Sequence, residues 1–284
     1  MMPGKKIAYR YTYITVGVIA VVSILFYLLI VLFPQMPLMY GIGLPVAFLL
    51  INALLVYGVA RRYANEMTAW IESTYQSEKS FISNASHELN NPLTAIQGEC
   101  EISLMKERSP SEYQASLRRI ASEAQRIIQL MKRLMFLSKG EDEILKTASR
   151  TIILADFIMQ FLEKRILFSP DNFAFMLDMN PQLLETALGN IIGNALKYSG
   201  DKMVEIRLRG SVLEIKDQGI GIPQEELNRI FQPFYRATNT REYAGNGIGL
   251  SLSVHILRVY GAQVSISSVL HEGTKVRIDF QHVK

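Results

Sequence analysis

The sequence predicts three structural regions in order: a membrane α-hairpin of two transmembrane helices, an α-helical hairpin dimerising to a four-helix bundle, and an α/β two-layer sandwich. Three observations predict them. No Asp, Glu, Lys or Arg occurs from Tyr11 to Ala60. Apolar residues follow heptad spacing between residues 82 and 134, and they alternate with polar residues in short runs between residues 204 and 280.

Composition limits the kinds of protein and site that the chain can represent. Its 284 residues suffice for about two domains, or for two small domains and a membrane segment. The single cysteine, Cys100, excludes an internal disulfide framework and a multi-cysteine metal site. The net charge of +4 is mild and part of it flanks the apolar segment, so we expect no nucleic-acid partner.

The uncharged segment Tyr11–Ala60 is too long for one transmembrane helix and suits two helices of about 20 residues each. Pro34 and Pro37 mark the turn, which places the spans near Ile14–Phe33 and Leu38–Ala60. Basic residues flank both outer ends, namely Lys5, Lys6, Arg10, Arg61 and Arg62. By the positive-inside rule we expect both ends of this hairpin in the cytoplasm, with an outer loop too short to fold into a ligand-binding domain.

A short segment around His87 carries the first candidate site. Apolar residues recur at three- and four-residue steps from Ile82 to Pro92, which predicts a buried helical stripe with His87 on the opposite, solvent-facing side. An exposed neutral imidazole is a nucleophile and proton carrier near pH 7, and the carboxylate of Glu88 follows it. Because Pro92 lacks an N–H, we expect the helix to bend or loosen beside His87. A surface histidine without a catalytic role would have the same local pattern.

The His87 helix is expected to end at about Arg108, where a second helix follows. Ser109–Glu112 predicts its start, with a capping box and a proline at the first helical position. Apolar residues then follow heptad spacing from Leu117 to Leu134. Two such helices joined by a tight turn leave an apolar stripe exposed, and a second hairpin would bury it, so we expect a homodimer.

The C-terminal part mixes helices and strands. After a charged linker, Ala155–Leu167 is predicted to be helical and Phe173–Leu177 to be a short strand. Asn180 and Pro181 are the expected N-cap and first residue of a helix that runs to about Ser199. Further strands are predicted at 204–208, 213–215, 264–266 and 276–280, which gives a largely antiparallel sheet with one face covered by helices.

Two polar clusters of this part could bind a ligand. Asn190, Asn194 and Lys197 share one helix face, where amide oxygens suit a hard cation such as Mg²⁺ and the lysine suits phosphate. A plain polar helix face is the alternative. Asp217 follows a strand directly and can accept a hydrogen bond from the exocyclic amine of adenine. Gly219 and Gly221 after it let the backbone approach a ligand, although an ordinary tight turn would also use them.

A third cluster consists of glycines before a helix. Gly245, Gly247 and Gly249 precede the predicted helix Ser251–Val259, whose N-terminal N–H groups can face phosphates. The spacing is neither the dinucleotide fingerprint nor a P-loop, so this motif is weak by itself.

The order of these segments resembles that of a two-component sensor histidine kinase, from about residue 80 to 280. The segments that resemble the family's H, N, G1, F and G2 boxes are Ser86–Leu93, Asn190–Tyr198, Asp217–Gly221, Phe231–Phe234 and Gly245–Gly249. A chance match to the whole ordered set is far less probable than a match to one motif. Asn90 departs from the family pattern, in which arginine is usual, and this puts a charge contact near the acceptor in question.

The resemblance implies a role for each part of the H box. His87 would be the phospho-acceptor and attack the γ-phosphate of ATP through Nε2. Glu88 would orient the imidazole and take its other proton. Asn91 would orient water in the reverse, dephosphorylating reaction.

The resemblance also implies an ATP-binding sandwich of the kind found in DNA gyrase. Asn194 would bind Mg²⁺ with help from Asn190, Lys197 would meet the phosphates, Tyr198 would flank the adenine, and Asp217 would accept from its amine. The remaining residues expected at the nucleotide are Gly219, Gly221, Phe231, Phe234, Arg236, Gly245, Gly247 and Gly249.

Domain boundaries follow from these assignments. They are a cytoplasmic N-terminus at 1–10, the transmembrane helices at 11–60, a helical linker at 61–79, the dimerisation and phosphotransfer domain at 80–138, a linker at 139–150, and the catalytic ATP-binding domain at 151–284. The expected location is the bacterial inner membrane, multi-pass, with the catalytic domains in the cytoplasm.

The leading hypothesis is therefore a membrane-bound, ATP-dependent protein-histidine kinase that phosphorylates an aspartate of a separate response regulator. A membrane adaptor that binds nucleotide as a switch and transfers nothing is a second hypothesis. An enzyme that acts mainly as a phosphatase on its regulator is a third. With a short outer loop, the stimulus would be read within the bilayer or through a partner membrane protein.

Overall fold

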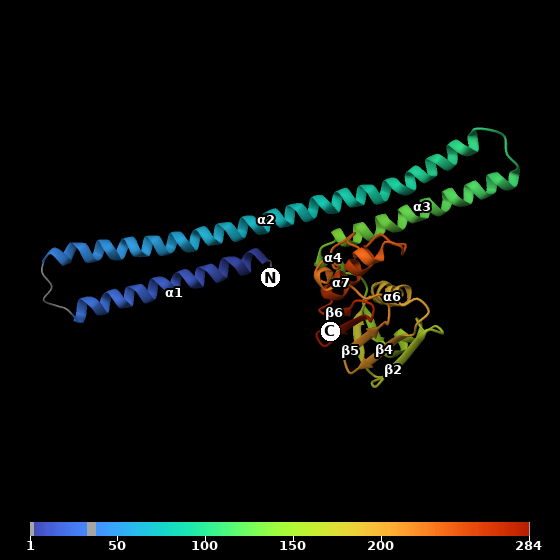
Figure 1. The fold of residues 1–284 in the computed structure, drawn as a ribbon. Helices are drawn as coiled ribbons and strands as arrows, with labels where there is room; N and C mark the ends of the chain where they lie inside the picture. The colour runs from blue at the N-terminus through green and yellow to red at the C-terminus, as the bar shows by residue number, and fades with distance from the viewer. Residues whose placement is uncertain (1–2, 33–37, 284) are drawn as a thin grey trace. The chain divides into compact units, whose positions relative to one another are not determined.

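The computed structural model describes residues 3–32 and 38–283, and it divides into two compact units between Ser80 and Phe81. Figure 1 shows the elements of each unit. The first unit contains α1 (Pro3–Leu32) and the first part of α2 (Leu38–Leu104), and α2 continues into the second unit.

The first unit is a pair of helices whose aromatic side chains meet. The rings of Phe26 and Phe48 stack with centroids 4.4 Å apart. Both helices are long and apolar enough to cross a membrane by length and composition, α1 from Tyr9 to Leu28 and α2 from Val46 onward. The predicted turn and the end of the first span, at residues 33–37, lie outside the described residues.

In the second unit the end of α2 and α3 (Pro110–Ser138) form a helical hairpin (Figure 1). The predicted end of the first helix at Arg108 is wrong by four residues, because α2 stops at Leu104. The helix runs through Pro92 without interruption, and this proline is buried.

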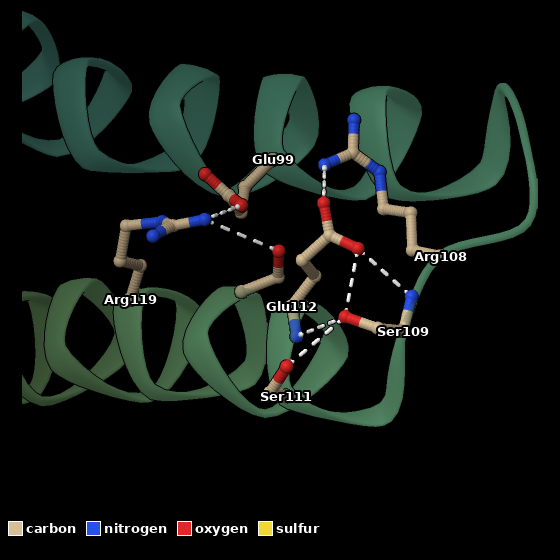
Figure 2. A network of polar contacts seen from close by, with 7 residues as sticks. Glu99, Arg108, Ser109, Ser111, Glu112 and Arg119 are labelled. Carbon is tan, nitrogen blue, oxygen red and sulfur yellow. Dashed lines mark hydrogen bonds and ion pairs between the residues drawn. The ribbon is translucent and has the colours of Figure 1, made fainter.

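The capping box at the start of α3 is confirmed, and it belongs to a polar network at the hairpin turn (Figure 2). The Ser109 N–H donates to the Glu112 carboxylate at 2.8 Å, and the Glu112 N–H donates to the Ser109 hydroxyl at 3.4 Å. Arg119 of α3 donates to Glu99 of α2 at 2.6 Å, and this bond, followed by the Ser116 hydroxyl, is the main cause that lowers the pKa of Glu99 to about 2. The network therefore ties the two helices together close to their connection.

The sandwich is built on a five-stranded sheet in the order β2-β4-β5-β7-β6, and its largely antiparallel character is confirmed. Only the pair β2 and β4 is parallel within the described residues. The strands are β2 (Ile166–Pro170), β4 (Val204–Arg209), β5 (Val212–Lys216), β6 (Gln263–Val269) and β7 (Gly273–Asp279).

Helices α6 (Pro181–Tyr198) and α7 (Gly249–Val259) cover one face of this sheet, as predicted (Figure 1). The Asn180 side chain caps α6 by accepting from two backbone N–H groups. Fully buried side chains of the helices and the sheet, such as Leu188 and Ile206, form the core between the layers.

Two predictions for the start of the sandwich are wrong. Ala155–Leu167 is not one helix, because α5 (Leu154–Met159) ends early and Ile166 begins β2, which pairs with β4 much later in the chain. The predicted strand at Phe173–Leu177 is displaced to β3 (Met176–Met179), which pairs with β1 (Arg150–Ile153) in a two-stranded sheet.

The segment 139–150, predicted to be a linker, contains α4 (Glu141–Leu145) and the first residue of β1. Ile144 of α4 is fully buried and belongs to the same core as the sandwich. This segment thus packs against the domain that follows it.

Candidate functional site

A cavity of about 240 Å³ lies where α6, the loop after β5 and the segment before α7 meet, and we name it the central cavity. All but three of the residues expected at a nucleotide line it. They are Asn190, Asn194, Lys197, Tyr198, Asp217, Gly221, Arg236, Gly245, Gly247 and Gly249. Residues from separate sequence motifs are therefore brought together around one space.

Asp217 is the acidic residue of the central cavity, and its side chain is held in place by the backbone. Its exposed fraction is 6%, and Oδ1 accepts from the N–H of Gly219 at 2.8 Å and from that of Thr274 at 3.1 Å. Burial raises the pKa of Asp217, while the two N–H groups oppose this rise. Within the described chain Oδ2 makes no hydrogen bond, so it remains available to accept from a ligand N–H.

The backbone around Asp217 is packed so closely that side chains do not fit at two neighbouring glycines. Gly221 has φ +66°, and a Cβ there would lie 2.1 Å from the carbonyl oxygen of Val269. Gly273 has φ +126°, and its Cβ would lie 2.1 Å from the carbonyl oxygen of Asp217. The sequence reasoning missed Gly273 and Thr274, for which a glycine at the start of a strand was the available signal.

Three cations line the central cavity against the single carboxylate of Asp217: Arg133, Lys197 and Arg236. Burial, followed by the charge of Arg236, lowers the pKa of Lys197. The Arg236 guanidinium donates to the carbonyl groups of Thr240 and Tyr243, which fixes its direction. A surplus of positive charge in a concave site favours a polyanionic ligand.

Asn190 and Asn194 lie one turn apart on α6 and supply neutral oxygen donors. Asn190 Nδ2 donates to the carbonyl of Gly249 at 3.3 Å, which links α6 to the start of α7. The described residues contain no group of three or more His, Cys, Asp or Glu that could hold a metal ion. The amide oxygens of Asn190 and Asn194, together with oxygens of a ligand, are donors of the kind that suit a hard cation such as Mg²⁺.

Gly219, Phe231 and Phe234 do not line the central cavity, so the expected direct contact with a ligand is not seen for them. Gly219 acts through its bond to Asp217. The N–H of Phe234 donates to the carbonyl of Gly247 at 3.0 Å, and the Phe234 ring lies 5.6 Å from that of Phe81 between centroids. The aromatic segment therefore supports the glycine-rich segment from outside the cavity.

His87 is exposed on α2, as predicted, and neither His87, Glu88 nor Asn91 lines the central cavity. Glu88 lines a second depression, which we name the α2–α3 groove. The groove is lined by Glu88, Pro92, Ser122, Glu123, Gln125, Arg126, Gln129, Leu130, Arg133, Gly245 and Asn246. The glycine-rich segment thus borders both the central cavity and the helix that carries His87.

Comparison with known proteins matches two regions of the chain. Residues 77–143 match the family described as the His Kinase A (phospho-acceptor) domain. Residues 179–284 match the family described as the Histidine kinase-, DNA gyrase B-, and HSP90-like ATPase. The first region contains His87 and the second contains nearly all of the central cavity.

Similar proteins are found among curated sequences and among solved structures. The chain is 32% identical over 233 residues to the signal transduction histidine-protein kinase ArlS of Staphylococcus aureus, covering 76% of this chain and 51% of that protein. The chain thus spans about half the length of the curated relatives it matches. The histidine kinase AdeS of Acinetobacter baumannii, 20% identical, has a similar fold with a TM-score of 0.51 over 69% of this chain and 98% of that one. Taken with the two matched domains, the similarity to ArlS shows that the chain belongs to the two-component sensor histidine kinases.

Proposed function

We propose that the protein is a membrane-bound protein-histidine kinase that transfers the γ-phosphoryl group of ATP to His87 and then to an aspartate of a separate response regulator. The observation that carries this proposal is the position of the glycine-rich segment. Gly245 and Asn246 line both the central cavity and the groove that contains Glu88. A nucleotide held in the cavity would therefore have its phosphates directed towards the acceptor helix.

The central cavity suits ATP at both ends of the molecule. Asp217 Oδ2 accepts from the exocyclic amine of adenine, and the ring of Tyr198 flanks the base. Lys197 and Arg236 neutralise phosphate charge. Asn194, assisted by Asn190, would hold Mg²⁺, which supplies further charge neutralisation for phosphoryl transfer.

The transfer step uses the neutral imidazole of His87. Its Nε2 lone pair forms the bond to the γ-phosphorus while the bond from that phosphorus to the β–γ bridging oxygen breaks, and ADP leaves with the electron pair. Glu88 accepts the proton from Nδ1 and so removes the positive charge from the phosphorylated ring. Asn91, which is exposed on the same helix, orients water for dephosphorylation of the regulator.

The unit of function is a homodimer held in the cytoplasmic membrane by α1 and the start of α2. In the single chain, two apolar residues of α3 that follow the heptad spacing are exposed, Leu117 by 63% and Met131 by 49%. Burying them against a second hairpin supports dimerisation. The apolar, outward-facing first unit supports residence in the membrane, where the stimulus is read in the bilayer or from a partner membrane protein.

The test is labelling of the purified full-length protein with γ-³²P-ATP and magnesium in detergent. Acid-labile, base-stable label on the wild-type protein and none on His87→Gln is expected. Adding the regulator to labelled Asn91→Ala separates the kinase reaction from the phosphatase reaction, because this variant should retain transfer and lose dephosphorylation. Nucleotide binding without any label would instead support an adaptor that uses nucleotide as a switch, and label that persists in His87→Gln would overturn the assignment of the acceptor.

A further inference from the structure

We propose that Arg133 of α3 binds the terminal phosphate of the nucleotide and positions it for attack by His87; this inference rests on the proposed function. Three residues line both the central cavity and the α2–α3 groove: Arg133, Gly245 and Asn246. Arg133 is the charged one among them. A phosphoryl group that passes from the cavity to the acceptor helix would pass beside its guanidinium.

The hydrogen-bond donors of Arg133 are unused. Its side chain is half-buried, yet within the described residues it makes no ion pair or hydrogen bond. The other two cations of the central cavity already donate to backbone carbonyls, Lys197 to Ala244 and Arg236 to Thr240 and Tyr243. A guanidinium with all five N–H donors available can bind two phosphate oxygens at once.

The acceptor helix brings no cation of its own to this place. From Ser80 to the end of α2 at Leu104 there is no Lys or Arg, and the residue one turn beyond His87 is the neutral Asn91. A loose, anionic phosphoryl group between two anionic neighbours, the departing ADP and Glu88, needs nearby positive charge. Arg133 supplies this charge from the neighbouring helix.

Packing fixes the direction in which Arg133 points. Leu130 lies three residues before it and Leu137 four residues after it, so all three lie on one face of α3. Leu130 is 5% exposed and both leucines belong to or pack against the core of the second unit. The helix is thus held with this face towards the central cavity.

The experiment compares Arg133→Gln and Arg133→Lys with a matched control, Lys132→Gln. Lys132 is the neighbouring cation on α3, is exposed, and lines neither the central cavity nor the groove. For each full-length variant in detergent, the Kd for ADP, the Kd for ATP with magnesium, and the rate of His87 labelling at saturating ATP are measured.

We expect Arg133→Gln to slow labelling by about tenfold to hundredfold and to weaken ATP several-fold, while ADP affinity changes by less than about twofold. Arg133→Lys should recover part of the rate, because it retains the charge but not the paired donors. Unchanged ADP affinity also shows that the variants are folded.

Three results would overturn the proposal: wild-type labelling by Arg133→Gln, an equal loss of ADP and ATP affinity, or the same loss of rate in Lys132→Gln. A different result would contradict the proposed function itself: a wild-type protein that is not labelled by ATP. In that case the difference between ATP and ADP affinity still reports whether Arg133 contacts the terminal phosphate.

Discussion

The sandwich and the helical hairpin belong to one unit but bury their apolar side chains in opposite ways. In the described part of this unit, the buried core runs from Ile144 to Phe280, and the hairpin adds only Leu130 to it. Apolar side chains of the hairpin are exposed instead, for example Ile82 by 58% and Met135 by 61%. The sandwich is complete within one chain, whereas the hairpin needs a second surface.

Because of this difference, the nucleotide-binding residues lie in a region that is stable within one chain, whereas the acceptor His87 lies in a region that needs a second chain. The residues that hold Asp217 come from the sandwich itself, through the N–H groups of Gly219 and Thr274. His87 instead lies exposed on a helix whose own apolar stripe is incomplete. We therefore expect substitutions in the sandwich to act on nucleotide binding within one chain, and substitutions on the exposed apolar stripe of the hairpin to act through dimerisation.

The largest difference in stability is expected between two glycine-to-alanine substitutions, one in the sandwich and one in the hairpin. Gly221→Ala should destabilise the sandwich by about 2–4 kcal/mol and abolish nucleotide binding, because its φ is +66° and the new Cβ would lie 2.1 Å from a carbonyl oxygen. Gly98→Ala in α2 should instead stabilise the hairpin by up to about 1 kcal/mol, because among the described residues nothing lies within 4 Å of its Cβ position. Hydrogen exchange measured by mass spectrometry locates each change in its own region. Equal tolerance of both substitutions would contradict the tight packing around Asp217.

A charge on the exposed stripe should break the dimer and spare the sandwich. Leu117 is 63% exposed in the single chain, and we expect the second hairpin to bury it. Leu117→Glu would place a carboxylate in that interface, so the dimer dissociation constant should rise at least about a hundredfold. Light scattering of the purified protein measures this constant, and Gln114→Glu, at an exposed polar position of the same helix, is the control. ADP affinity should stay the same in both variants. A Leu117→Glu protein that remains dimeric would place the dimer contact elsewhere.

Local signals were predictable from the sequence because they depend on neighbouring residues. The capping box at Ser109, the N-cap at Asn180 and the start of α6 at Pro181 need only a few residues of context, and each is confirmed. The strand β2 was missed because its partner is the distant β4, where Ile166 pairs with Val204 in parallel.

The residues of the candidate site likewise fall into two groups: those that belong to a local motif and those that enter the site from distant elements. Asp217 belongs to a local motif, so its position in the central cavity could be predicted from the sequence. Thr274 and Arg133 enter the site from β7 and α3; the glycine before Thr274 is a weak signal for it, and no motif marks Arg133. The exclusion of Phe234 from the cavity depends on its contacts with Gly247 and Phe81, which are remote in sequence. Residues contributed by one motif were found, and residues contributed by packing between elements were not.

The smallest effects are expected at two carboxylates whose pKa values move in opposite directions. The bond from Arg119 lowers the pKa of Glu99 from 4.5 to about 2, so this carboxylate stabilises the folded hairpin above pH 4.5, and the contribution is lost as the pH falls towards 2. Burial raises the pKa of Asp217 above 3.8, so its ionised form destabilises the folded sandwich at neutral pH, and protonation removes that cost. Scanning calorimetry of Glu99→Gln and Asp217→Asn at pH 7 and pH 3 measures both contributions.

At pH 7 the Tm of Glu99→Gln should therefore fall below that of the wild-type protein, and the Tm of Asp217→Asn should rise above it. Both differences should shrink at pH 3, for different reasons: Asp217 is then protonated in the folded protein, whereas Glu99 stays ionised in the folded protein but is protonated in the unfolded chain, so part of its stabilising contribution is lost. Asp217→Asn should also lose ATP affinity as it gains stability, since the carboxylate that burial disfavours is the one that accepts from the adenine amine. If Asp217→Asn instead loses stability together with ATP affinity, the Asp217 carboxylate stabilises the folded sandwich. The sandwich would then not be stable independently of the residue that binds the ligand, which would contradict this prediction.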